Sequence, residues 1–236
     1  MATIVLAHGA WSAAWAWKKV RPLMAQAGHT FFTPTYTGLG QRAHLASPDN
    51  DLDTHIRDVL GVLDYEDLHD VVLLAHSYGG MVGTGVADRA RARIRHLIYL
   101  DAFVPDDGKA LMDYLPEAQR QRMMEGMTAG DGWRVPPAPT PEDTSEADKA
   151  WIGAKRLPQS VKCFATPLRL QNGPLTLPRS YIQAMKYPHG PFGQFAARAK
   201  QEPGWKTYEI DSSHSPNVTA PEALMAVLKQ AMAAQD

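Results

Sequence analysis

One short segment combines a serine with the small residues that a tight turn requires. An apolar run at 70–75 leads into His-Ser-Tyr-Gly-Gly at 76–80, and a helical stretch follows. A serine on such a strand–turn–helix connection is held in a strained conformation, exposed as a nucleophile, and the residues two before and two after it must be small. Gly79 and Ala75, the latter in place of the usual glycine, meet that requirement. We therefore predict that Ser77 attacks an acyl carbon.

A nucleophilic serine needs a base, and histidine is the side chain best suited to move a proton near neutral pH. His214 follows the last apolar run and precedes the C-terminal helical stretch, where the chain order nucleophile, acid, histidine places the base. We interpret His8 and His76, which flank the site, as structural. Five further histidines are expected at surface or capping positions: His29, His44, His55, His69 and His96.

The attack creates a negatively charged oxygen, which two fixed backbone N–H groups can stabilise. The N–H of Tyr78, directly after the nucleophile, is the first predicted donor. The second is expected in the loop after the first apolar run, and we assign it to Ala10. Gly9 allows the backbone there to approach a substrate closely.

The acid that orients His214 is the least determined part of the site. After the run at 180–185 the chain reads Lys-Tyr-Pro-His-Gly-Pro, without the carboxylate that this chain order leads us to expect. The turn that carries Ser77 is a nucleophile elbow, and a helical stretch follows it. Asp101, at the end of the apolar run after that helical stretch, is our predicted acid, although a strand-end aspartate also caps turns. Asp211 and Glu209 stay open as alternatives.

Apolar runs and helical stretches alternate along the chain, as they do in βαβ units. Strands are predicted at 2–7, 30–36, 70–75, 96–100, 180–185 and 206–210, and helices at 15–27, 53–68, 81–93, 192–201 and 221–234. Continuous apolar runs suit strands that are buried on both faces. The sequence therefore predicts an α/β protein with a mostly parallel sheet and helices on both faces.

The segment 105–178 interrupts this alternation. It is rich in methionine, proline, aspartate and glycine, has helical pieces at 114–126 and 145–155, and shows no sheet strand. We predict a cap at 105–178, inserted before the penultimate strand, on a core formed by 1–104 and 179–236. Because ligands bind at the carboxyl ends of parallel strands, Gly9, Trp11 and Met127 are predicted to contact substrate. The cap methionines could equally form the cap's own core.

Composition narrows the possible partners. The formal net charge is −1, with 24 Lys and Arg against 25 Asp and Glu, so the sequence has no basic excess for nucleic acid or anionic lipid. The single cysteine, Cys163, excludes an intramolecular disulfide and a cysteine-based zinc site, and we expect it to be buried. We expect a cytoplasmic protein without a membrane segment, metal or cofactor, whose partner is a neutral small molecule. A homodimer stays open.

Several stretches resemble the group of plant methyl-salicylate-type esterases and hydroxynitrile lyases, within the α/β-hydrolase superfamily. They are His-Gly-Ala-Trp at 8–11, Thr-Pro-Thr-Tyr-Thr-Gly-Leu-Gly at 33–40, Arg-Ala-His-Leu at 42–45, the helical stretch 52–68, Ala-His-Ser-Tyr-Gly-Gly at 75–80, Tyr-Leu-Asp-Ala-Phe-Val-Pro at 99–105, and His214 with Pro-Glu at 221–222. The resemblance implies a capped α/β-hydrolase fold without a cofactor, acting on esters of small, fairly apolar acids or alcohols.

The same resemblance separates hydrolysis from two rival functions. A lyase of this group would carry threonine at the position of Gly9 and lysine directly after the histidine, where Ser215 stands. A carboxylic-ester hydrolase is therefore favoured over a hydroxynitrile lyase. A ligand-binding protein that keeps the fold with a weak triad is the second rival, and the missing acid favours it.

Overall fold

A computed structural model describes residues 1–233, and its centre is a parallel sheet of six strands. The strands lie in the order β2-β1-β3-β4-β7-β8, and every neighbouring pair is parallel. Their bounds are β1 Thr3–Ala7, β2 Thr30–Phe32, β3 Val71–His76, β4 Ile94–Leu100, β7 Arg179–Ala184 and β8 Trp205–Ile210. All six predicted strands are present, so the predicted α/β architecture is confirmed.

The strand β2 is shorter than predicted, because it ends at Phe32 and not at residue 36. Pro34 has no N–H to donate to a neighbouring strand. Beyond it, the N–H of Tyr36 donates to Nε2 of His8 at 3.3 Å instead of continuing the ladder.

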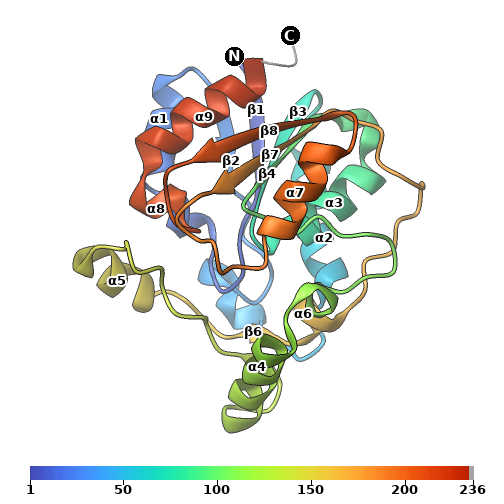
Figure 1. The fold of residues 1–236 in the computed structure, drawn as a ribbon. Coiled ribbons are helices and arrows are strands. Elements are labelled where there is room, and N and C mark those ends of the chain that lie inside the picture. Colours follow the sequence, from blue (N-terminus) through green and yellow to red (C-terminus); the bar gives the residue numbers. More distant parts are fainter. Residues whose placement is uncertain (234–236) are drawn as a thin grey trace.

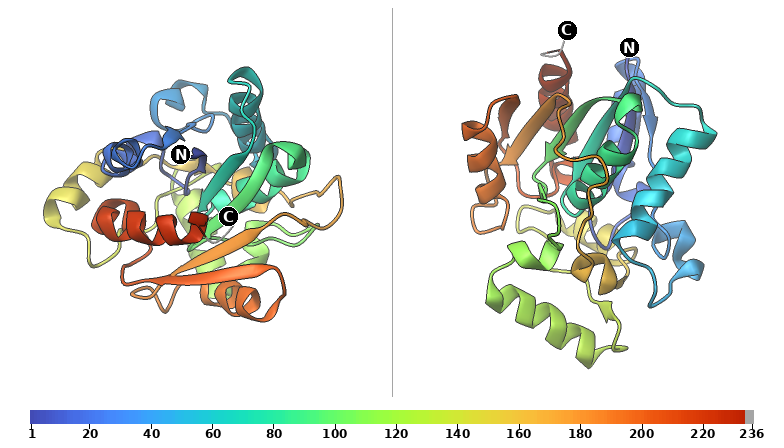
Figure 2. Two further views of the ribbon diagram at one scale, coloured as in Figure 1. Left: turned by 90° about the horizontal axis from the view of Figure 1, so that it is seen from above. Right: turned by 90° about the vertical axis from the view of Figure 1, so that its right-hand side faces the viewer.

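Helices cover both faces of the sheet (Figures 1 and 2). Side chains alternate along the central strands, so that Val5 and Leu73 join one apolar cluster with α2, α3 and α7, while Leu6 and Leu74 join another with α1 and α9. The helix bounds are η1 Ala14–Trp17, α1 Val20–Gln26, η2 Gly40–Leu45, α2 Leu52–Tyr65, α3 Gly79–Arg89, η3 Arg91–Arg93, α7 Gly193–Gln201, α8 Pro216–Thr219 and α9 Pro221–Ala233. Burial on both faces explains the continuous apolar runs in the sequence.

Several helix predictions differ from the structure in their extent. The predicted helix 53–68 ends at Tyr65, and the predicted helix 81–93 begins at Gly79 and ends at Arg89, before the separate η3. The stretch 15–27 is divided into η1 and α1, separated at Lys18 and Lys19. The predicted helix 221–234 begins at Pro221, and its last residue, Ala234, lies outside the described residues.

The chain between β4 and β7 lies at the carboxyl ends of the strands, at the bottom of Figure 1. It contains η4 Leu111–Tyr114, α4 Glu117–Ala129, β5 Arg134–Val135, α5 Glu146–Gly153, β6 Gln159–Ser160 and α6 Lys162–Ala165. The expectation that this segment has no strands is wrong, since β5 and β6 pair as a short antiparallel ribbon. We call 105–178 the cap, with its bounds kept as predicted.

The two predicted cap helices begin where local chemistry allows. α4 begins at Glu117, later than the predicted residue 114, and directly after Pro116. Proline has no backbone N–H to donate, so it is found at or before the first turn of a helix. α5 is capped by Ser145, whose Oγ accepts from the N–H of Asp148 at 3.1 Å.

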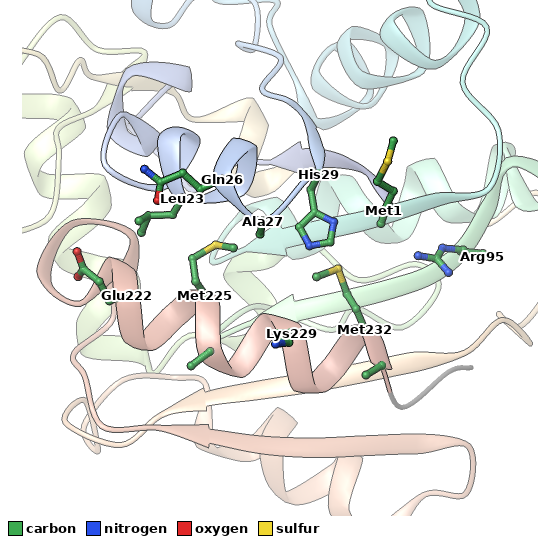
Figure 3. A pocket seen from close by; sticks show the side chains of 13 residues that line it. Met1, Leu23, Gln26, Ala27, His29, Arg95, Glu222, Met225, Lys229 and Met232 are labelled. Atoms are coloured by element: carbon green, nitrogen blue, oxygen red, sulfur yellow. The ribbon is translucent and has the colours of Figure 1, made fainter.

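Among residues 1–233, no helix is long and apolar enough to cross a membrane. A hollow of the surface lies between α1 and α9, near the starts of β1 and β4 (Figure 3), and is lined in part by Leu23, His29, Arg95 and Met225. Because this hollow lies at the amino ends of β1 and β4 and Ser77 follows the carboxyl end of β3, the two are at opposite ends of the sheet.

Candidate active site

Ser77 occupies a sharp turn between β3 and α3. Its φ is +59°, which is uncommon for a residue other than glycine and marks strain of the kind found at functional sites. The turn is held because Ser77 N–H donates to the carbonyl of Leu100 and the N–H of Phe103 donates to the carbonyl of Ser77. A Cβ at Gly79 or Gly80 would collide with backbone carbonyls, of Ala7 and Phe103 respectively. The elbow therefore requires both glycines.

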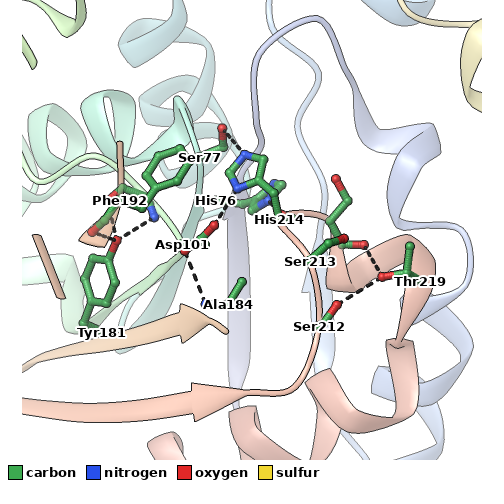
Figure 4. Close-up of polar contacts among 12 residues, drawn as sticks. His76, Ser77, Asp101, Tyr181, Ala184, Phe192, Ser212, Ser213, His214 and Thr219 are labelled. Atoms are coloured by element: carbon green, nitrogen blue, oxygen red, sulfur yellow. Dashed lines mark hydrogen bonds and ion pairs between the residues drawn. The ribbon is translucent and has the colours of Figure 1, made fainter. Parts of the chain in front are cut away.

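His214 joins the serine to a carboxylate. It lies in the loop between β8 and α8, with Nε2 2.9 Å from Oγ of Ser77 and Nδ1 2.7 Å from Oδ2 of Asp101 (Figure 4). The carboxylate accepts from Nδ1–H, so Nε2 is left free to accept the serine proton. His76, beside the nucleophile, donates from Nε2–H to the backbone carbonyl of His214 at 2.8 Å. The structure thus brings the predicted nucleophile and base into contact.

Asp101 is the carboxylate that reaches His214, and the alternatives do not. It directly follows β4, has φ +41°, is 1% exposed, and accepts the N–H of Ala184 on its second oxygen at 3.3 Å. Asp211 is paired with Lys186 at 3.0 Å, and Glu209 with Lys200 at 2.9 Å, both at the surface. The position after β7 needs no acid, because β4 supplies one.

The two predicted oxyanion donors are available. Among the described residues, neither the N–H of Ala10 nor that of Tyr78 has an acceptor, although the neighbouring N–H groups of Trp11 and Ser77 do. The loop after β1 lies against the elbow, since a Cβ at Gly9 would lie 3.2 Å from Cβ of Ser77. Two unused donors beside a serine–histidine pair suit the stabilisation of an oxyanion.

Residues 4–227 match the family described as the alpha/beta hydrolase family. The chain belongs to this family. The hydrolase is 40% identical over 234 residues to the carbendazim hydrolyzing esterase of Nocardioides sp. (strain SG-4G), covering 95% of this chain and 97% of that one. It is 32% identical to methylesterase 9 of Arabidopsis thaliana over 103 residues, 43% of this chain and 40% of that one.

A solved structure agrees over nearly the whole hydrolase. It is an extracellular alpha/beta-hydrolase from a Paenibacillus species, described as sharing structural and functional homology with tobacco salicylic acid binding protein 2. The TM-score is 0.88 at 24% identity, covering 98% of this chain and 99% of that one. The predicted fold class and the resemblance to this esterase group are confirmed, and the protein is an enzyme of the esterase type.

Aromatic rings that the sequence reasoning missed surround His214 in this hydrolase. The ring of Phe192 stacks on the imidazole with centroids 4.5 Å apart and planes 9° apart, and Tyr187 lies 5.2 Å away. Both residues follow β7, in the segment that lacks a carboxylate. The stacking restricts the imidazole to one plane and gives the site an apolar side.

The prediction that His55 and His96 occupy surface or capping positions is wrong. Both are 1% exposed. His55 stacks on Tyr36 and accepts from the hydroxyl of Tyr78 on Nδ1 at 2.9 Å, while Nε2–H donates to the carbonyl of Thr37 at 3.1 Å. His96 bonds to Oγ of Ser180 at 2.9 Å. Their burial replaces water by fixed partners within the hydrolase core.

Three buried histidines around the site are held neutral. Burial lowers the pKa of His8 to about 4 and the pKa values of His55 and His76 to about 3. At neutral pH these imidazoles serve as hydrogen-bonding groups without charge. Proton transfer is therefore left to His214.

The three residues predicted to contact substrate lie in different parts of the structure. Trp11 has φ +56°, its ring lies 5.4 Å from that of Phe164, and its Nε1–H donates to the carbonyl of Val135. Met127, on α4, is partly buried and packs against the main core cluster. Gly9 lies beside the elbow, so it is the member of this set placed against Ser77.

Cys163 is buried, as expected, and burial raises its pKa to about 12. The thiol therefore stays protonated at neutral pH and is no rival nucleophile. Within residues 1–233, no three His, Cys, Asp or Glu side chains are grouped to hold a metal ion.

Proposed function

We propose that the protein is a carboxylic-ester hydrolase that works through an acyl-enzyme on Ser77. The observation that carries the proposal is the continuous chain of contacts from Oγ of Ser77 through His214 to Asp101, at 2.9 and 2.7 Å. Hydrogen-bonded nucleophile, base and orienting acid are the parts that acyl transfer requires.

In the first half-reaction, Oγ of Ser77 attacks the ester carbonyl while Nε2 of His214 takes its proton. Asp101 holds Nδ1–H and stabilises the imidazolium that forms. The N–H groups of Ala10 and Tyr78 donate to the oxyanion. As the tetrahedral intermediate collapses, the ester C–O bond breaks and His214 gives the proton to the leaving alcohol.

In the second half-reaction, water attacks the acyl-enzyme and His214 takes its proton. The same two N–H groups hold the second oxyanion. Collapse releases the carboxylic acid and returns the proton to Oγ of Ser77. No group beyond these side chains and amides is required.

Small, fairly apolar esters are the proposed substrate class. The rings of Phe192 and Tyr187 beside His214 support it, because they offer apolar surface next to the reacting carbonyl. Ser215 provides no cation to hold a departing cyanide, which supports hydrolysis over a lyase. Asp101 removes the missing acid as an argument for a non-catalytic binding protein.

Release of p-nitrophenol from p-nitrophenyl acetate tests the proposal. We expect a burst of one equivalent per active site, and a loss of about four orders of magnitude or more in kcat for Ser77→Ala and His214→Ala. The exposed His44 provides the control, and His44→Ala should keep the wild-type rate. Carbendazim belongs in the same substrate panel, because a relative 40% identical is named for its hydrolysis. Activity that survives Ser77→Ala defeats the proposal.

A further inference from the structure

The loop that carries Ala10 is attached to the cap at three points, all on Trp11. The N–H of Trp11 donates to Oε1 of Gln159 at 2.8 Å, and its indole N–H donates to the carbonyl of Val135 at 2.9 Å. Its carbonyl accepts from the N–H of Leu157 at 3.3 Å. Val135 and Gln159 are paired residues of the β5–β6 ribbon, so one small element makes or adjoins all three contacts.

Trp11 needs such support because of its backbone. Its φ of +56° is rare for a bulky side chain, and such a residue persists only where its surroundings enforce the conformation. The N–H of Ala10 belongs to the residue immediately before it. A relaxation of Trp11 to negative φ would therefore turn the chain beside the oxyanion donor.

The side chain of Gln159 is buried at this contact and does not reach solvent. It is 2% exposed, its Oε1 accepts from the N–H of Trp11, and its amide lies against the Cys163 thiol. Burying an amide is costly unless its groups are bonded, and the bond to Trp11 N–H is the one that ties Gln159 to the loop after β1.

Tyr78, the other predicted oxyanion donor, also has a buried polar partner, and this partner lies near Gln159. The hydroxyl of Tyr78 is held by His55, and His55 and Gln159 line one small cavity together with Cys163. A buried polar side chain thus holds Tyr78 itself and, beside Ala10, the neighbouring residue Trp11.

We propose that Gln159 is a positioning residue for the oxyanion hole, which holds the Ala10 N–H in place through its bond to Trp11. The inference rests on the proposed ester hydrolysis. It gives the cap a part in the chemical step, because β6 carries a side chain that orders the loop after β1. Interactions that act mainly in the transition state raise kcat without tightening substrate binding.

Two substitutions at one position test this role. Gln159→Leu removes the acceptor at similar size, Gln159→Glu keeps an acceptor oxygen, and Gln121→Leu on the exposed face of α4 is the control. We expect Gln159→Leu to lower kcat by about 10- to 100-fold with KM changed less than about twofold. The glutamate variant should recover part of the lost kcat, and the control should match wild type.

A pair of inhibitors separates positioning from general damage to the fold. A trifluoromethyl ketone forms an adduct with Ser77 that carries an oxyanion, whereas the matching methyl ketone resembles the ground state. Gln159→Leu should weaken binding of the trifluoromethyl ketone by the same factor by which it lowers kcat. Binding of the methyl ketone should stay unchanged. If this variant gives too little folded protein, Gln159→Met replaces it, with rates normalised to active sites titrated by a fluorophosphonate.

Three results would overturn the inference: unchanged kcat in Gln159→Leu, equal weakening of both ketones, or a glutamate variant no better than the leucine variant. These differ from a failure of the proposed function. If wild type is not labelled by the fluorophosphonate, ester hydrolysis at Ser77 itself is wrong. If wild type is labelled and Gln159→Leu behaves like it, only the role of Gln159 is wrong.

Discussion

Asp101 holds the imidazole of His214 with one carboxylate oxygen and the end of β7 with the other. This double attachment fixes the carboxylate between two neighbouring strands of the sheet. It also explains its positive φ, because the backbone must turn at the strand end while its own N–H donates to Ile182. The acid is thus positioned by its contacts with the neighbouring strand β7.

Replacing this carboxylate should remove the orienting contact while keeping the shape of the side chain. We predict that Asp101→Asn lowers kcat by about 10³- to 10⁴-fold, as loss of the acid does in a serine protease. Asp211→Asn is the matched control, since Asp211 pairs with Lys186 at the surface. Steady-state rates on p-nitrophenyl acetate measure both. A loss confined to Asp211→Asn would show that the acid is misassigned.

The sequence allowed the nucleophile, the base and a preferred acid to be named, because each follows an apolar run whose end lies at the same edge of the sheet. His55 was misplaced, although the spacing Leu52, His55, Val59 puts it on the buried stripe of α2. Gln159 had no comparable signal. Its partner Trp11 is 148 residues away, and only the folded cap brings them together.

At the scale of elements, the approach of α3 to its neighbours is set by glycines. Gly80 opens α3 against the carbonyl of Phe103, whereas Gly61 in the middle of α2 has no atom within 4 Å of a would-be Cβ. Replacing glycine by alanine should therefore disturb the packing of α3 at Gly80 but not that of α2 at Gly61. Close approach of α3 is what presents Ser77 at the end of the sheet.

We predict that Gly80→Ala lowers the free energy of unfolding by about 1–3 kcal/mol or more, because the added methyl group must displace backbone. Gly61→Ala should raise it by about 0.5–1 kcal/mol, because alanine favours a helix interior over glycine. Urea unfolding followed by circular dichroism measures both. Equal effects in the two helices would contradict the packing described for α3.

The order and type of the core elements could be predicted, because continuous apolar runs and helical stretches are local signals. The end of β2 at Phe32 and the β5–β6 ribbon could not. The end of β2 depends on the hydrogen bond from Tyr36 N–H to His8, which lies 28 residues away in the sequence. The ribbon depends on the pairing of two-residue strands, which are too short to show a sequence pattern.

At the scale of the whole molecule, the buried neutral histidines link stability to pH. The pKa values of His8, His55 and His76 lie at about 3 to 4 in the folded protein, below the ordinary 6.5. Between pH 6.5 and about 4 the unfolded chain therefore binds more protons than the folded one. Stability is complete above pH 6.5 and is lost as the pH falls through this window.

We predict that the free energy of unfolding falls between pH 7 and pH 5, with a slope approaching about 4 kcal/mol per pH unit at the acid end if all three histidines contribute fully. Urea titrations at pH 7, 6 and 5 measure the slope. His55→Phe should reduce this slope by the contribution of one proton, about 1.4 kcal/mol per pH unit, whatever its effect on stability at pH 7. A stability that does not change over this range would mean that these imidazoles are not held neutral.

In the proposed reaction, the hydroxyl of Ser77, activated by the imidazole of His214, forms the covalent intermediate. Intact-mass and peptide analysis after treatment with a fluorophosphonate tests it most directly. We predict a single adduct located on Ser77, formed in step with the loss of esterase activity and absent from Ser77→Ala. An unmodified wild type, or an adduct on another residue that accounts for the lost activity, would contradict the account.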